Sequence, residues 1–510
     1  MREKSLLVKV SRYDPSQEIS PVFEDYRVPF TKGMSVIDAL RYVRENCDPS
    51  LAFRYRCRVG YCGSCSLLVN GTPRLACMEE IDEGIQSLVI EPLPNFPVIR
   101  DLVVDLDAPE ENLLSIRPFL ERREPFQGVW PLKDTEFGVL EELSRCMSCM
   151  SCMGSCPVFS RVPQKFPGPW HLLNIGRFAF DPRDEADRAR MAFFQGLYLC
   201  AFCGKCEEVC PSEIRIPHLV IQELRRLVAH EMGLLPGHRE LVDNLKKKGE
   251  TLVSVGRTFL EEAPHKVSPD KINERVGLFV GCVADVMEKD SLRAAVDILS
   301  RNNVEVVIPK DQLCCGNLEL YGITLKDSRQ IARRNAASFE REDLEVVLTV
   351  CPACGFFLKN EYTGEEGLLE RQPSFKVEDI NEFLSNYIKF DPKDFREMRA
   401  KVTWHDPCHL KREQKISEEP RKILQMIPGV EFVEMREPDR CCGGTLRASA
   451  PDVAGLLGMD KVRQGRETGA DYVLTSCPLC VSHLSLSRAK AKIRKPRVMN
   501  ILDFIAKAYR

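Results

Sequence analysis

The chain has 510 residues, which is too many for one hydrophobic core, so we expect three or four domains. Its hydrophobic content of 44% is ordinary for a globular protein, and its net charge of −3 gives no reason to expect binding to nucleic acid. The sequence has neither an apolar run of about 18 residues nor a signal-peptide pattern, so we expect a cytoplasmic protein without a transmembrane anchor.

Residues 1–100 show the alternation of β-strands, near residues 6–10 and 26–30, with a helical pattern at 36–43. Prolines at 92, 94 and 97 mark the end of this first domain. Residues 101–235 are richer in helical patterns, for example at 184–194, and we assign them to a second domain. The fold class predicted for the whole chain is multidomain α/β and α+β.

The 23 cysteines are the unusual feature of the composition, and all but Cys47 lie in clusters. In a reducing compartment, clustered cysteines indicate metal ligands rather than disulfides, which leaves zinc and iron–sulfur sites as the choices. Cys47 has no neighbouring cysteine, so we expect it to be a buried thiol and not a ligand.

The first cluster has the spacing C-x4-C-x2-C followed by one further cysteine, which is typical of a plant-type 2Fe–2S site. Gly60 and Gly63 allow the loop to wrap closely around such a cluster, and the paired C-x2-C knuckles of a zinc site are missing. The predicted ligands are Cys57, Cys62, Cys65 and Cys77.

The next two clusters are runs of the bacterial ferredoxin type, C-x2-C-x2-C-x3-C-P. In proteins with two such runs, the fourth cysteine of each run binds the cluster of the other run. We therefore predict two cubane 4Fe–4S clusters. Their ligand sets are Cys146, Cys149, Cys152 and Cys210 for one cluster, and Cys156, Cys200, Cys203 and Cys206 for the other.

Residues 236–274 are polar and lysine-rich in part, and two interpretations stay open: a linker, or a solvated surface helix followed by a loop. From residue 275 onward the chain repeats itself. Matching cysteines lie 126 residues apart (Cys282 and Cys408), 127 apart (Cys314 and Cys441) and 126 apart (Cys351 and Cys477). We predict a tandem pair of domains, at 275–400 and 401–510, and not a solenoid.

In each copy the first cysteine and the C-P-x-C pair follow a short β-rich run, and helical segments such as 290–300 intervene. Alternation of strands and helices predicts a parallel α/β sheet. Cysteines placed after such strands converge at the carboxyl edge of the sheet, where open α/β folds place their sites.

The two N-terminal modules, in this order, resemble the iron–sulfur subunit of the succinate dehydrogenase and fumarate reductase family over residues 1–235. The resemblance implies a β-grasp 2Fe–2S domain, an α-helical two-cluster ferredoxin domain, and a separate FAD-containing flavoprotein subunit as partner. Quinone-reactive members of the family typically lack a cysteine at the position of Cys203, so the usual quinone role is in doubt.

The repeated half resembles the cysteine-rich CCG domains of the heterodisulfide reductase family. In that family each complete five-cysteine set holds a non-cubane 4Fe–4S cluster, and a disulfide is cleaved between the two clusters. Both sets are complete here: Cys282, Cys314, Cys315, Cys351 and Cys354 in the first copy, and Cys408, Cys441, Cys442, Cys477 and Cys480 in the second. Gly316 and Gly443 allow consecutive thiolates to reach one inorganic core. A regulatory vicinal disulfide, the alternative, explains neither the C-P-x-C pair nor the repetition.

His405 and His409 flank a cluster cysteine, and His483 follows Cys480 closely. Because thiol oxidation releases protons, a nearby imidazole can accept them, and His409 and His405 are the catalytic candidates. The alternative is that these histidines are supporting hydrogen-bond donors. No G-x-G-x-x-G or Walker sequence indicates a nucleotide or flavin site in this chain.

Together the halves resemble the thiol:fumarate reductase family of methanogens. The resemblance implies oxidation of coenzyme M and coenzyme B thiols at the CCG domains, with electrons passing through the 4Fe–4S and 2Fe–2S clusters to the flavoprotein, which reduces fumarate. Two alternatives are a quinone-linked succinate dehydrogenase, with the basic tail 489–509 on a membrane, and a non-catalytic electron-transfer subunit. A terminal helix packed on the last domain is the other interpretation of that tail.

Overall fold

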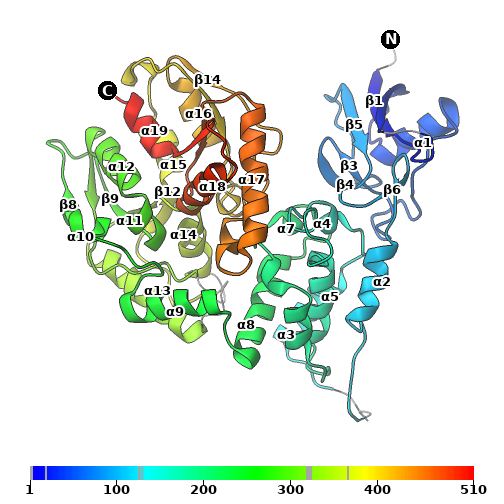
Figure 1. Ribbon diagram of the computed structural model, residues 1–510, viewed down its shortest axis with the longest axis horizontal. Coiled ribbons are helices and arrows are strands. Elements are labelled where there is room, and N and C mark those ends of the chain that lie inside the picture. Colours follow the sequence, from blue (N-terminus) through cyan, green and yellow to red (C-terminus); the bar gives the residue numbers. More distant parts are fainter. Residues whose placement is uncertain (1–3, 18–19, 125–127, 129, 318–323, 364–366) are drawn as a thin grey trace. The chain divides into compact units, whose positions relative to one another are not determined.

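The computed structural model describes residues 4–17, 20–124, 128, 130–317, 324–363 and 367–510. The chain forms two compact units (Figure 1). Unit 1 consists of residues 1–200 and 204–224, and unit 2 consists of residues 201–203 and 225–510.

Unit 1 begins with a five-stranded sheet in the order β2-β1-β5-β3-β4, in which β1 and β5 are parallel and the other neighbours antiparallel. Alternate residues of β1, Leu6, Val8 and Val10, are buried and form the core with the apolar face of α1. The elements are β1 (Ser5–Arg12), β2 (Val22–Pro29), α1 (Val36–Asn46), β3 (Ser66–Val69), β4 (Thr72–Leu75) and β5 (Ser87–Glu91). The strands and the helix expected at 36–43 are confirmed.

The rest of unit 1 is mainly helical. The helix expected at 184–194 begins later, at Arg188, because the carboxylate of Asp187 accepts a hydrogen bond from the backbone N–H of Arg190 and caps the helix there. The elements are β6 (Val98–Arg100), β7 (Val103–Val104), α2 (Asp107–Ser115), α3 (Asp134–Ser144), α4 (Ser151–Gly154), α5 (Pro169–Ala179), α6 (Arg188–Phe194), η1 (Leu197–Leu199), α7 (Lys205–Glu208) and η2 (Ile216–Gln222).

The first CCG copy is built on a sheet in the order β12-β11-β9-β10-β8, which is parallel except for β8. Its strands are β8 (Lys266–Val267), β9 (Glu274–Phe279), β10 (Val304–Val307), β11 (Val346–Thr349) and β12 (Lys376–Asp379). Its helices are α11 (Cys282–Met287), α12 (Lys289–Arg301), α13 (Leu325–Glu340), α14 (Pro352–Phe356), η4 (Phe357–Glu361), α15 (Ile380–Phe383), η5 (Leu384–Ile388) and η6 (Pro392–Asp394).

The second copy has a wholly parallel sheet in the order β14-β13-β15-β16. Its strands are β13 (Ala400–Trp404), β14 (Val430–Phe432), β15 (Tyr472–Thr475) and β16 (Arg497–Asn500). Its helices are η7 (His409–Glu413), α16 (Glu418–Met426), η8 (Gly444–Ala448), α17 (Pro451–Glu467), α18 (Pro478–Lys490) and α19 (Ile501–Ala508). The predicted strand–helix alternation is confirmed in both copies, and the two copies share one apolar core.

Residues 236–274 are part of unit 2 and not a free linker. They contain α9 (Pro236–Lys248) and α10 (Phe259–Glu262), and β8 adds to the sheet by pairing with β10. The helix preceding them is α8 (Glu223–Met232). Of the two interpretations left open by the sequence, the surface helix followed by a loop describes this segment better.

The C-terminal helix α19 packs beside α12 of the first copy (Figure 1). Its apolar residues, among them Ile501, Phe504 and Ile505, are buried in the shared core. The packed terminal helix is therefore the correct interpretation of the tail. Within the described ranges, no helix has both the length and the apolar character that crossing a membrane requires.

Candidate iron–sulfur centres

Three cysteines of the first set, Cys57, Cys62 and Cys65, lie in the loop before β3, and the fourth, Cys77, follows β4. The Cys57 sulfur accepts hydrogen bonds from the backbone N–H groups of Val59 and Tyr61, at 3.5 and 3.4 Å. Burial raises the pKa of Cys65 to about 12, and its contact with Cys77 contributes to this shift. The other three cysteines are half-buried, and a hydrogen bond with Ser64 lowers the pKa of Cys62 to about 6, which favours the thiolate that an iron cluster binds.

This loop approaches the first ferredoxin run closely. Gly63 has a φ of +71°, and a Cβ there would lie 2.8 Å from the carbonyl oxygen of Met147 and 2.9 Å from the Cα of Cys149. The hydroxyls of Ser66 and Ser151 are hydrogen-bonded at 2.8 Å nearby. The backbone therefore comes near the ferredoxin cysteines where only glycine fits.

Four cysteines of unit 1 line one pocket, and they are those of the first predicted 4Fe–4S set: Cys146, Cys149, Cys152 and Cys210. Apolar side chains, including Trp170, Leu173 and Ile214, form the rest of its wall. Burial raises the pKa of Cys152 well above its usual range, and the neighbouring thiols add to the shift. The fourth cysteine of the second run thus lies beside the first three of the first run, which is the exchange expected from the sequence.

The second predicted set is distributed differently between the units. Cys156, Cys200 and Cys206 belong to unit 1, and Cys203 belongs to unit 2. Within unit 2, the carbonyl oxygen of Cys203 accepts a hydrogen bond from Arg412 at 3.2 Å, and its thiol contacts Cys441. This ligand set remains a prediction.

In the first CCG copy the cysteines follow the carboxyl ends of β9, β10 and β11, as the spacing of strands and cysteines predicts. The thiols form a continuous series of contacts in the order Cys282, Cys314, Cys315, Cys354, Cys351. Four of them are buried, and Cys282 is half-buried and accepts a hydrogen bond from Thr251 at 3.2 Å.

The second copy repeats this arrangement after β13, β14 and β15. Its thiols are in contact in the order Cys408, Cys441, Cys442, Cys480, Cys477. The sulfur atoms of Cys442 and Cys480 are 3.4 Å apart. Five converging thiols in each copy match the donor set of the non-cubane cluster that the CCG resemblance implies, and soft thiolates are the ligands that iron–sulfur clusters take.

Gly316 and Gly443 adopt the left-handed backbone that the sequence suggested, with φ values of +92° and +84°. This conformation costs a residue with a side chain about 1–2 kcal/mol. It turns the chain directly after each cysteine pair, so that both thiols face the other members of the set.

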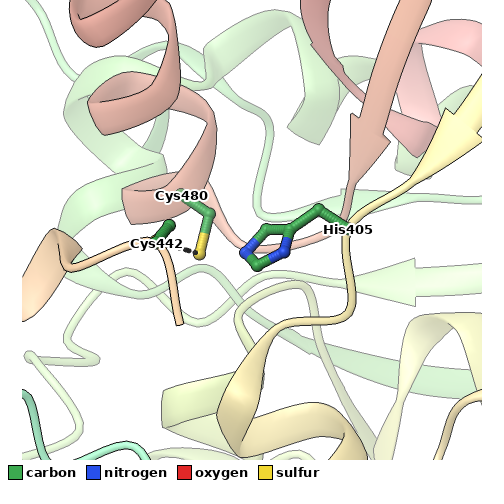
Figure 2. Close-up of side chains that lie close together, drawn as sticks. All are labelled: His405, Cys442 and Cys480. Atoms are coloured by element: carbon green, nitrogen blue, oxygen red, sulfur yellow. Dashed lines mark hydrogen bonds between the residues drawn. The ribbon is translucent and has the colours of Figure 1, made fainter. Parts of the chain in front are cut away.

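The three histidines of the second copy are all buried, and they differ in what they contact. His405 lies close to Cys442 and Cys480 (Figure 2). His409 has its Nδ1 3.8 Å from the Cys408 sulfur, and its ring stacks on Phe356 of the first copy with centroids 5.9 Å apart. His483 points away to the carbonyl oxygen of Ala454, at 3.0 Å. Burial lowers the pKa of His409, so its imidazole is neutral near pH 7.

Two features of the site were not found from the sequence. Thr251 lies in the segment 236–274, and nothing in its local pattern indicates contact with Cys282. Asp406 follows His405 directly in the sequence and is buried. Its carboxylate accepts hydrogen bonds from both terminal nitrogens of Arg421, at 2.9 and 2.8 Å. The expectation for Cys47 was wrong: its thiol is exposed at the end of α1.

Three family models match the chain in this order. A 2Fe-2S iron-sulfur cluster binding domain matches residues 7–111, and a 4Fe-4S dicluster domain matches residues 142–214. A cysteine-rich domain matches twice, at residues 276–359 and 402–485, which confirms the duplication. The protein is therefore a multidomain mixed α/β protein with 2Fe–2S, 4Fe–4S and CCG domains.

A fumarate reductase (CoM/CoB) subunit of Methanothermobacter marburgensis is 36% identical over 98% of this chain and 99% of its own length. The fumarate reductase iron-sulfur subunit of Escherichia coli O157:H7 is 35% identical over 43% of this chain and 91% of its own length. A hypothetical protein from Helicobacter pylori, 14% identical, shares the fold over 99% of this chain and 95% of its own, with a TM-score of 0.64. This chain therefore belongs to the family of iron–sulfur oxidoreductase subunits that includes the fumarate reductase (CoM/CoB) subunit of M. marburgensis.

Proposed function

We propose that this chain is the iron–sulfur subunit of a thiol:fumarate reductase. Coenzyme M and coenzyme B thiols each lose a proton and together lose two electrons, and their sulfurs join in a mixed disulfide. The two electrons and two protons convert fumarate to succinate on the FAD of a separate flavoprotein subunit. The main support is that both CCG copies carry a complete set of five converging cysteines.

The proposed cofactors are one 2Fe–2S cluster, two cubane 4Fe–4S clusters and two non-cubane 4Fe–4S clusters on the ligand sets given above. These clusters supply single-electron steps between a disulfide and a flavin, which each take two electrons. The approach of Gly63 to Cys149 supports direct electron transfer between the first ferredoxin set and the 2Fe–2S loop. The mixed five-stranded sheet with α1 supports the β-grasp assignment of residues 1–100.

The surface around the 2Fe–2S loop supports the proposal that the flavoprotein docks there. Three large apolar side chains around it are exposed: Val59 (71%), Tyr61 (82%) and Met78 (61%). Apolar residues gathered at a cluster-binding loop are typical of a docking surface. Replacing Tyr61 by Glu should weaken association with the flavoprotein. The same change at Leu114, which is 74% exposed on α2, serves as the control.

We also propose that His409 serves the thiol chemistry of the second copy as a proton acceptor, and that His405 serves it from its place beside Cys442 and Cys480. His409 is close to Cys408 and reaches the first copy through Phe356, so its ring lies between the two cysteine sets. A neutral imidazole in this place can take up a proton that a thiol releases.

The decisive experiment is anaerobic co-purification with the flavoprotein, followed by assays of the separate half-reactions. The proposal requires that fumarate causes coenzyme M and coenzyme B thiols to disappear together, in equal amounts. If quinol drives fumarate reduction and the thiols do not, the quinone-linked alternative is correct.

Iron analysis tests the same proposal without an activity assay. Five filled sites predict about 18 iron atoms per chain, from one two-iron and four four-iron clusters. A value near ~10 would mean that the CCG copies hold no clusters, which removes the basis of the thiol chemistry.

A further inference from the structure

The two CCG copies are not chemically equivalent around their cysteine sets. The offset of 126 residues that relates Cys282 to Cys408 also relates Phe279 to His405. Both side chains come at the carboxyl end of the central strand of their copy, and both are 1% exposed. The first copy therefore has a phenyl ring where the second has an imidazole.

The backbone determines the protonation of this imidazole. Nδ1 of His405 is 3.0 Å from the carbonyl oxygen of Pro438, which can only accept a hydrogen bond, so Nδ1 carries the proton. Nε2 is then the ring nitrogen left to bind a ligand. It has no hydrogen-bond partner, although the residue is buried.

Nε2 faces the cysteine set. A ring nitrogen of His405, the Cys442 sulfur and the Cys480 sulfur all lie within 4.8 Å of one another. Figure 2 shows that the nitrogen remote from the backbone, Nε2, is the one turned toward Cys480. Among the described residues, this is the group whose imidazole and thiol donors are placed to share a metal ion.

A lone pair directed at two thiolates is repulsive unless a proton or a metal ion lies between them. A metal-bound histidine almost always donates its other N–H to a carbonyl or carboxylate, and His405 does so to Pro438. Donor atoms of a tetrahedral metal with bonds of about 2.0–2.3 Å lie about 3.5 Å apart, which is compatible with the 3.4 Å between the two sulfurs. Phe279, which belongs to the same core cluster as Cys351 and Cys354, offers no such donor.

We propose that His405 Nε2 is a sixth ligand to the iron cluster of the second CCG set, and that the two copies therefore hold electronically different clusters. The inference depends on the proposed function, because it requires a cluster at each copy. Because ligand identity sets the reduction potential of an iron–sulfur cluster, the two CCG clusters should then have different midpoint potentials.

The test compares His405→Phe with His483→Phe in the full-length chain, purified anaerobically after selective labelling with 15N-histidine. Each variant introduces the residue that the first copy has, Phe279 or Phe357, in place of a buried histidine. His483 hydrogen-bonds to Ala454 away from the ligand group, so it is the matched control. His405→Gln is a second variant, in case a phenyl ring does not fit.

With the CCG clusters made paramagnetic, the wild type and His483→Phe should show the strong nuclear coupling of an iron-bound 15N-histidine. His405→Phe and His405→Gln should lose it, and one midpoint potential should shift relative to the wild type. Iron near ~18 per chain without such coupling, or coupling that survives in both His405 variants, overturns the inference alone. Iron near ~10 overturns it together with the proposed function.

Discussion

The hydroxyl of Ser291 lies 3.0 Å from a carboxylate oxygen of Asp503, which joins α12 of the first CCG copy to α19 of the second. The same hydroxyl lies 3.0 Å from Oε2 of Glu288. One hydroxyl proton cannot satisfy two carboxylates at once. The junction between the copies is therefore most stable when one of the two acids keeps its proton.

We predict that Glu288 makes the stability of this junction depend on pH. Burial raises the pKa of Glu288 to about 7, with the charge of Asp503 contributing, and burial also raises the pKa of Asp503. The folded state therefore holds a proton that the unfolded state loses above its lower pKa. The free energy of unfolding falls as the pH rises from about 4.5 to about 7, and this contribution stays lost above that range.

Glu288→Gln should remove this effect, so the variant should gain about 2 kcal/mol relative to the wild type between about pH 5 and pH 8. Apparent melting temperatures of the anaerobic protein at the two pH values measure the difference. Glu370→Gln, at a side chain that is 86% exposed in an ion pair with Arg333, is the control. An unchanged pH dependence in Glu288→Gln would contradict the prediction.

The glycines after the two cysteine pairs should respond differently to alanine. At Gly443 a Cβ would lie 2.9 Å from the Cβ of Leu457, whereas at Gly316 the nearest atoms are 3.5 Å away. Both substitutions cost about 1–2 kcal/mol of backbone strain, and Gly443→Ala adds about 1–3 kcal/mol of overpacking. Melting temperature and iron content should fall more for Gly443→Ala; equal losses in both variants would argue against this packing.

Much of the fold could be predicted because the cysteines follow strands with regular patterns. The β-rich run at Val304–Val307 and the apolar run before Cys351 each predict a strand, and a parallel sheet then brings their cysteines together. By contrast, β8 is too short, and too charged at Lys266, for any period to show. Its place is decided by its pairing with β10.

The details of the site depend on contacts that sequence spacing does not encode. His405 is far along the chain from Cys442 and Cys480, and the pairing of β13 with β15 helps to bring them together. Cys47 was expected to be buried because isolated cysteines usually are, but α1 ends at that point and its side chain leaves the core. In both cases tertiary structure decides, and local pattern does not.

Removing Arg421 should be strongly destabilising, because it leaves the carboxylate of Asp406 buried without its countercharge. Asp406 has no exposed side-chain area and also accepts a hydrogen bond from the indole of Trp404 at 2.8 Å. Arg421→Met should cost about 3–5 kcal/mol, and the double variant with Asp406→Leu should recover part of that loss.

Thermal unfolding of the anaerobic proteins measures these changes. Arg399 is the matched control, because its side chain is 89% exposed in an ion pair with Glu397, and Arg399→Met should change stability by no more than about 0.5 kcal/mol. A loss for Arg421→Met as small as that of the control would show that the buried pair is not needed.

The exchange of cysteines between the two ferredoxin runs predicts which cluster each cysteine binds, and substitutions can test this. Cys210 lies in the pocket with Cys146, Cys149 and Cys152, although it belongs to the other run. Cys210→Ser should therefore alter the same electron paramagnetic resonance signal as Cys146→Ser, and leave unchanged the signal that Cys200→Ser alters. Cys47→Ser, at an exposed thiol, should alter neither signal. If Cys210→Ser and Cys200→Ser affect one and the same signal, each run binds its own cluster and the exchange is wrong.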